Sequence, residues 1–180
     1  MSAAKLARYL DYHRHLYPQL ERAITGRDDL QNPAFTFVPL FSPDTNIVCF
    51  IARPMAVRRG RLIDVDVGLE RLNELNRRVH ERMGEPAGPA GERMPYGHPF
   101  FVSRTRFDHT EYSAESISDL VSRIGVTADE YGQHDLFVLR SVVMNPHYEL
   151  AEQHAHEDYL MAFVRHLHDV TRQEIRALEE

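Results

Sequence analysis

The chain has 180 residues, of which 43% are hydrophobic and 27% are charged, and its formal net charge is −6. This length and composition are typical of one soluble globular domain. The negative net charge argues against a nucleic-acid partner, because surfaces that bind nucleic acids gather Lys and Arg. No apolar run approaches the roughly 20 residues that span a bilayer, so we expect no membrane partner.

The single cysteine, Cys49, lies within an apolar run at 46–51. An intrachain disulfide is therefore impossible, and a buried, inert thiol is the expected state. A cysteine nucleophile would have to be exposed and activated by a histidine or a helix N-terminus, which a position inside a strand does not favour. A reducing cytoplasm is the location that fits, because the first residues are polar rather than signal-like.

The first third of the chain predicts one helix followed by a hairpin. Apolar residues at helical spacing indicate a helix over 2–24, within an N-terminal segment 1–26 that packs on or links to the main domain. Alternating and continuous apolar residues then predict strands at 34–40 and 46–52. The Ser-Pro-Asp-Thr sequence at 42–45 is typical of the turn that would join them.

The middle of the chain predicts a second helix, a loop and a third strand. The helix is expected over 67–83, where leucines recur at helical spacing, and Gly84 is a natural terminator. Half of the residues at 85–92 are Pro or Gly, so we expect a surface loop there. The strand is expected at 100–106.

The last third predicts a helix, a strand and a long final helix. The first helix is expected over 114–124, capped by Ser113 and ended by Gly125. The strand is expected at 136–143, and the final helix follows Pro146.

This order of elements predicts an α+β domain over 34–180. We expect a mostly antiparallel four-stranded sheet covered by helices on one side.

Histidines raise the question of a metal site, because eleven are present. Three His-x-His pairs occur, at 13/15, 154/156 and 166/168. Positions two apart on a helix are separated by roughly 200°, so each pair would point to opposite sides, and solvated helix faces account for them. His154 with Glu157, or a site assembled across distant segments, remains the alternative, but we predict no metal ligands.

Motifs of self-contained catalysis are missing. The chain has no Gly-x-Ser-x-Gly elbow, no Gly-x-Gly-x-x-Gly fingerprint and no phosphate-binding Gly-Lys-Ser/Thr loop. We therefore predict no catalytic residues in this chain.

Four segments together form a more informative pattern. They are Pro-Asp-Thr-Asn-Ile-Val-Cys-Phe at 43–50, Leu-Asn-Glu-Leu-Asn at 72–76, Phe-Val-Ser-Arg-Thr at 101–105 and Leu-Arg-Ser-Val-Val-Met-Asn-Pro at 139–146. In this order they resemble the small C-terminal domain of fold-type I, group II pyridoxal-phosphate-dependent amino-acid decarboxylases. The resemblance runs from about residue 35 to the C-terminus and is strongest to the bacterial tyrosine decarboxylases.

The resemblance implies a role in a carboxy-lyase whose parent enzyme uses pyridoxal phosphate. The expected partners are a large cofactor-binding domain, on the same or a separate chain, a homo-oligomeric copy and an amino-acid substrate. In the tyrosine-type enzymes a serine matching Ser141 approaches the bound amino acid, so Ser141 is the predicted substrate-pocket residue. It could instead hydrogen-bond within its own sheet. Arg140 is expected to be a structural donor to a neighbouring loop, and Asn145 a turn residue.

The chain departs from the family at the cofactor lysine. In these enzymes a lysine that directly follows a histidine holds the cofactor as a Schiff base. Here Lys5 is the only lysine, and it follows Ala4. We therefore predict no cofactor-binding residues and no activity from this chain alone, which would be an isolated domain or one piece of a split enzyme.

Two further expectations follow from this departure. A small domain that packs on a larger one should expose the apolar surface of that contact when it is expressed alone. We therefore expect the isolated chain to self-associate. A free-standing, non-catalytic binding or regulatory domain with the same fold is the alternative function.

Overall fold

The computed structural model describes residues 35–40, 47–58, 61–84, 100, 102–142 and 159–179. The predicted helix at 2–24, the turn at 42–45 and the loop at 85–92 lie outside these residues. Within the described ranges, no helix combines the length and the apolar character needed to cross a bilayer.

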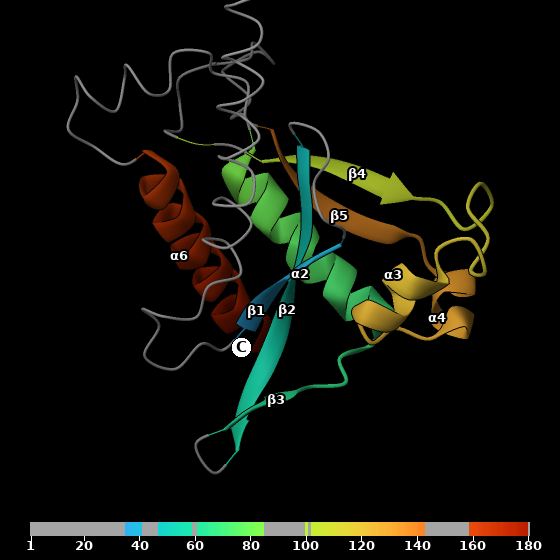
Figure 1. The fold of residues 1–180 in the computed structure, drawn as a ribbon. Coiled ribbons are helices and arrows are strands. Elements are labelled where there is room, and N and C mark those ends of the chain that lie inside the picture. The colour runs from blue at the N-terminus through green and yellow to red at the C-terminus, as the bar shows by residue number, and fades with distance from the viewer. Residues whose placement is uncertain are drawn as a thin grey trace, which may run out of the picture.

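The central element is an antiparallel sheet (Figure 1). Its strands are β1 (Phe35–Pro39), β2 (Ile47–Arg58), β5 (Leu136–Val142) and β4 (Ser103–Phe107), in the order β1-β2-β5-β4. The predicted four-stranded antiparallel sheet is therefore confirmed. A further strand, β3 (Arg61–Asp64), pairs with the end of β2 and was not predicted.

Two long helices, α2 (Gly68–Met83) and α6 (Tyr159–Glu179), cover one face of this sheet. Alternate residues of a strand point to the same face, so the apolar residues of β2 and β5 divide between two cores. The core on this face contains Phe37, Phe50, Phe137 and Leu139 from the strands, Leu75 and Val79 from α2, and Phe163 and Leu167 from α6. Both helices lie where the sequence predicts them.

The opposite face is covered by the chain around α3 (Ser118–Arg123), which corrects the expectation that helices lie on one side only. The second core joins Cys49, Ile51 and Val138 to Val121, Ile124 and Val126. The predicted helix at 114–124 forms only from Ser118 onward, and turns take the place of its first residues.

Gly125 ends α3 as predicted, through a Schellman motif. Its φ of +69° lies in the left-handed region that glycine adopts without strain. The Val126 N–H donates to the Val121 carbonyl at 3.1 Å, and the Gly125 N–H donates to the Ser122 carbonyl at 3.0 Å.

The short helix α4 (Ala128–Gln133) was not predicted, although its capping box is visible in the sequence as Thr127 and Glu130. The Glu130 Oε2 atom accepts hydrogen bonds from the Thr127 N–H and hydroxyl at 2.9 and 2.8 Å. These bonds lower the pKa of the Glu130 carboxyl. Its Oε1 atom accepts from the Leu69 N–H at 3.2 Å, so one carboxylate caps α4 and also the first turn of α2.

Two asparagines of α2 fill the gap where β2 and β5 separate. The pairing of these strands ends at Phe50 and Leu139. Asn76 replaces the lost strand partner of Ala52: it accepts from the Ala52 N–H at 2.8 Å and donates to the Ala52 carbonyl at 2.9 Å. This geometry satisfies both backbone groups of a fully buried residue.

Asn73, one turn earlier on α2, similarly pairs with backbone groups of two residues at the start of β5. It accepts from the Phe137 N–H at 2.9 Å and donates to the Asp135 carbonyl at 2.5 Å. The Leu-Asn-Glu-Leu-Asn motif therefore holds the helix between two diverging strands, and it fixes where β5 begins.

Candidate functional site

Ser141 lies near the C-terminal end of β5, opposite Val48 of β2. It is 8% exposed. Residues two apart on a strand share a face, so Ser141 is on the same side as Leu139, the face covered by α2 and α6. The pocket role of Ser141 stays a prediction.

Arg140, the neighbour of Ser141, is a structural donor to a strand rather than to a loop. Its Nε atom donates to the Ser103 hydroxyl at 3.0 Å. That hydroxyl donates to the Arg140 carbonyl at 3.0 Å, so the two residues join β4 to β5 through side chains as well as backbone. Asn145 lies outside the described residues.

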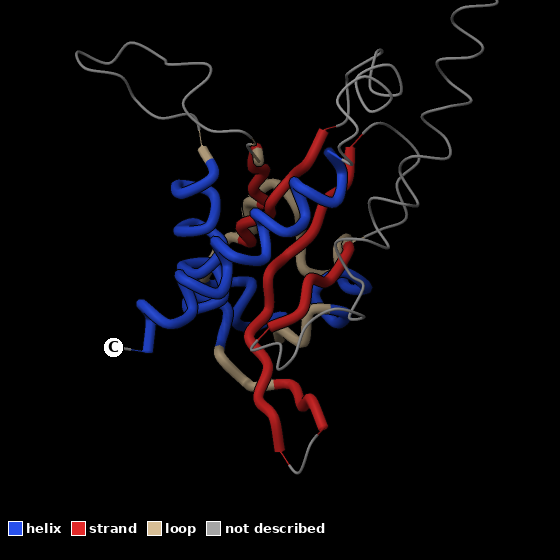
Figure 2. The backbone as a smooth tube through the Cα atoms, turned by 90° about the vertical axis from the view of Figure 1, so that its left-hand side faces the viewer, coloured by secondary structure: helices blue, strands red, loops and turns tan. Residues whose placement is uncertain are grey.

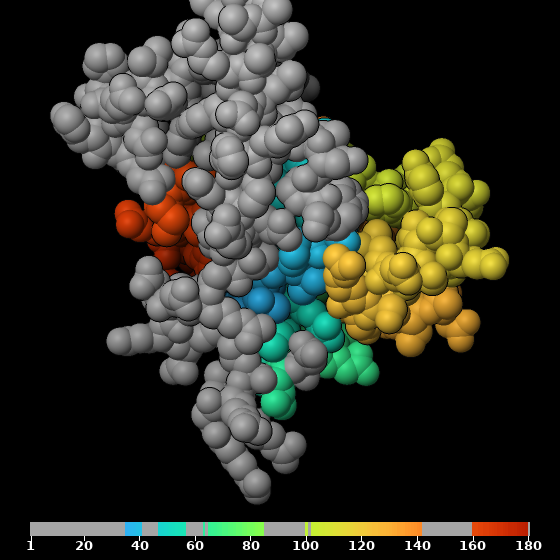
Figure 3. Space-filling model, in the orientation of Figure 1, coloured from blue at the N-terminus to red at the C-terminus, as the bar shows by residue number. Residues whose placement is uncertain are grey.

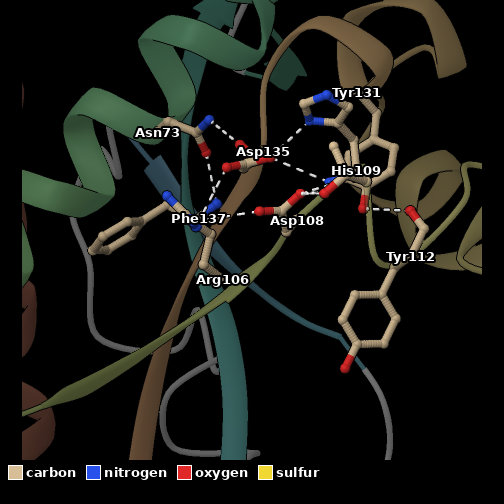
Figure 4. A network of polar contacts seen from close by, with 9 residues as sticks. Asn73, Arg106, Asp108, His109, Tyr112, Tyr131, Asp135 and Phe137 are labelled. Carbon is tan, nitrogen blue, oxygen red and sulfur yellow. Dashed lines mark hydrogen bonds and ion pairs between the residues drawn. The ribbon is translucent and has the colours of Figure 1, made fainter.

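The beginning of β5 carries a polar network that the sequence analysis did not predict (Figure 4). The Arg106 guanidinium, at the end of β4, lies across two carboxylates. Its Nε atom is 3.3 Å from the Asp135 carboxylate, and a terminal nitrogen is 3.4 Å from Asp108. The His109 Nδ1 atom is 2.8 Å from the Asp135 Oδ1 atom, which also accepts from the His109 N–H at 3.2 Å.

Asp108 begins the turn that leads from β4 into this network. Its Oδ1 atom accepts hydrogen bonds from the Thr110 hydroxyl at 2.6 Å and from the Thr110 N–H at 2.8 Å. These bonds, the hydroxyl first, lower the pKa of the Asp108 carboxyl. The carboxylate therefore holds the turn in place in its charged form.

A groove of about 680 Å³ opens beside the network, between α2 and the start of β5. Its lining contains acidic and basic side chains together with uncharged ones. The lining residues are Glu70, Arg71, Asn73, Glu74, Arg77, Arg106, His109, Gln133, His134, Asp135 and Phe137. Within it Arg77 pairs with Glu74, and Arg106 pairs with Asp135. This arrangement is a polar, internally neutralised surface, which suits contact with another surface better than bond-making chemistry.

A cation could in principle use Asp108, His109 and Asp135, since one ligand atom of each lies within 4.8 Å of the others. The Arg106 guanidinium already provides positive charge between the two carboxylates. A metal ion would have to displace it, so we assign no metal to these residues.

Cys49 and His168, one histidine of the His-x-His pairs, are buried and pack within the fold. Cys49 is buried, as predicted, and burial raises the pKa of its thiol while Arg140 opposes that shift. His168 was expected on a solvated face, but it is 8% exposed and its ring lies 5.4 and 5.0 Å from those of Phe35 and Phe37. Its position four residues after Val164 and three before Thr171, both buried, was the signal for burial.

The described residues do not fit a covalent pyridoxal-phosphate site. The Schiff base requires a lysine, and the only one in the sequence, Lys5, lies outside the described ranges. We therefore derive no catalytic step from these residues. The other His-x-His pairs, together with His154 and Glu157, also lie outside them.

The comparison with known families agrees with the resemblance read from the sequence. The family model for "Tyrosine decarboxylase, C-terminal" matches residues 15–170, which is most of the chain. Tyrosine decarboxylases are lyases and generally depend on pyridoxal phosphate. No match was found among curated proteins. From the extent of the family match, this chain belongs to the family of tyrosine decarboxylase C-terminal domains.

Proposed function

We propose that the chain is the small domain of a tyrosine- or aromatic-type amino-acid decarboxylase, where it shapes the substrate pocket and helps a dimer form. The observation that carries this proposal is the family match over 15–170. The large cofactor-binding domain, on the same or a separate chain, provides the Schiff-base lysine. Together they work in the cytoplasm, for which a buried thiol is suited.

Ser141 is the residue that we propose for the pocket. It lies one residue before the end of β5, where a strand gives way to the following segment. Side chains at strand ends commonly reach the cleft of a neighbouring domain. A hydroxyl there can donate to, or accept from, a polar substrate tip such as a phenol.

The test is substrate choice in the complete enzyme. Losing one neutral hydrogen bond costs about 0.5–1.5 kcal/mol, so Ser141→Ala should change the ratio of kcat/KM for phenolic over non-phenolic substrates by several-fold to about tenfold. The ratio is measured from initial rates with both substrates. Ser122→Ala, an exposed serine on α3, is the matched control and should leave the ratio unchanged. An unchanged ratio for Ser141→Ala would assign this serine to packing.

A second test concerns the chain alone. Mixed with pyridoxal phosphate, it should show no internal-aldimine absorbance and no release of carbon dioxide from tyrosine, because Lys5 is not placed like the family's cofactor lysine. Absorbance spectra and borohydride reduction followed by peptide mass analysis check this, with Lys5→Arg as the control. An adduct at Lys5 that supports turnover would contradict the proposal.

A further inference from the structure

The pairing of β4 with β5 ends one residue before Ser141. Ser103 is the first residue of β4, and it lies opposite Arg140. β2 still pairs with Ser141, through Val48. On the other side of Ser141, the last pair of the described β4–β5 ladder is therefore Ser103 with Arg140. β4 is the outermost of the described strands on that side, and its yellow-green residues reach the surface in the space-filling view (Figure 3).

Side chains make a second connection at this last pair. The Ser103 hydroxyl donates to the Arg140 carbonyl at 3.0 Å and accepts from the Arg140 Nε atom at 3.0 Å. A hydroxyl can donate and accept at the same time, so both bonds form together. The bond from the guanidinium is charge-assisted and therefore stronger than one between neutral groups. We call this arrangement the Ser103–Arg140 clamp.

The clamp fixes the backbone from which the Ser141 side chain projects. The Arg140 carbonyl belongs to the peptide plane that also holds the N–H and the Cα atom of Ser141. Neighbouring residues of a strand point to opposite faces. The clamp is on the face of Cys49, which pairs with Arg140, whereas Ser141 points to the face covered by α2 and α6. Figure 2 shows α6, which leads to the label C, beside the red strands. Ser103 can therefore act on Ser141 only through the backbone.

Thr105 shows what the same strand looks like without a clamp. It lies opposite Val138, two residues from Ser103 and therefore on the same face. Within the described residues its hydroxyl has no hydrogen-bond partner, yet β4 and β5 pair at this position. Pairing of the two strands thus does not require a side-chain clamp, and the clamp is found at the pair beside Ser141.

We propose that Ser103 is a positioning residue for Ser141. It orients the peptide between Arg140 and Ser141, and so it sets where the Ser141 hydroxyl lies in the substrate pocket. Two segments of the family pattern, 101–105 and 139–146, meet at this clamp. The inference rests on the pocket role proposed above for Ser141 and adds a residue that does not touch the substrate.

The test is the ratio of kcat/KM for phenolic over non-phenolic substrates in the complete enzyme. Ser103→Ala removes the clamp and should change this ratio in the same direction as Ser141→Ala, by about two- to fivefold, because a displaced hydroxyl bonds the substrate less well. Ser103→Thr keeps the hydroxyl in a residue that suits strands and should restore most of the parent ratio. Thr105→Val is the matched control and should leave the ratio unchanged.

A double-mutant cycle separates positioning from a general effect on the fold. In a Ser141→Ala background no hydroxyl is left to position, so Ser103→Ala should no longer change the ratio. A general loosening of the sheet would lower kcat/KM for both substrates alike, with or without the Ser141 hydroxyl. Circular dichroism melting checks folding, and Ser103→Ala should lower the Tm by about 2–4 °C. If Ser103→Ala does not fold, Ser103→Val removes the hydroxyl with a strand-forming residue and takes its place.

The outcomes distinguish this inference from the proposed function. If Ser141→Ala changes the ratio but folded Ser103 variants do not, Ser103 is not a positioning residue and the pocket role of Ser141 stands. An equal effect of Ser103→Ala with and without the Ser141 hydroxyl would also overturn the inference. If Ser141→Ala leaves the ratio unchanged, the proposed pocket role fails, and the role of Ser103 fails with it.

Discussion

Replacing Asn76 by alanine should lower the free energy of unfolding by about 2–5 kcal/mol, because each buried polar group left unpaired costs about 1–3 kcal/mol. Asn76 is fully buried, and its amide pairs with both the N–H and the carbonyl of Ala52, which is also fully buried. Water cannot reach these backbone groups to replace the amide. The measurement is urea unfolding followed by circular dichroism.

Asn76→Leu separates lost hydrogen bonds from lost volume. Leucine fills a similar space but leaves the backbone N–H and carbonyl of Ala52 without hydrogen-bond partners. It should therefore destabilise the protein about as much as alanine does. Glu81→Ala, at an exposed position of the same helix, is the control and should change stability by less than about 0.5 kcal/mol. If Asn76→Leu were as stable as the parent, the hydrogen bonds to Ala52 would not be what holds α2 in place.

Phe137→Ala should lower the free energy of unfolding by about 3–5 kcal/mol, the usual cost of removing a buried phenylalanine ring. The ring is 5% exposed and belongs to the core under α2 and α6. Two guanidiniums lie over it, Arg104 at 5.6 Å and Arg77 at 5.9 Å. Each can add about 0.5–1 kcal/mol of cation–π attraction.

A double-mutant cycle isolates that attraction. Arg104→Gln should cost about 0.5–1 kcal/mol in the parent and close to nothing when Phe137→Leu has removed the aromatic ring. Both differences come from urea unfolding at the same salt concentration. An equal cost of Arg104→Gln in the two backgrounds would show that the ring does not attract the guanidinium.

The sheet and the two long helices could be predicted because their apolar residues repeat with the period of the element. β2 and β5 carry apolar residues on both faces, which gives the continuous apolar runs at 47–52 and 136–139. The stripe of leucines on α2 similarly indicates its buried side. The family was also evident from short segments in order, and one of them, Leu-Asn-Glu-Leu-Asn, proves to contain the residues that hold α2 to two strands.

The shorter elements and the polar network could not be predicted on the same grounds. β3 has four residues, too few to establish a period. Asp108 and Asp135 are far apart in the sequence, and they meet because β4 and β5 pair in a particular register. His168 was misplaced because a histidine was assumed to face solvent, whereas its ring packs on two phenylalanines of β1.

The strand order has a consequence for how the chain folds. β5 is the last of the described strands in the sequence, yet it lies between β2 and β4. Its pairing with β2 joins residues as distant as Ile47 and Val142. Contacts at such separation form slowly, because a long loop must close before they do. During synthesis β1, β2 and α2 emerge before β5. Until β5 is made, the edge of β2 that pairs with it has no strand partner. Open strand edges promote aggregation, so a nascent chain that stops short of β5 should be the form most in need of a chaperone.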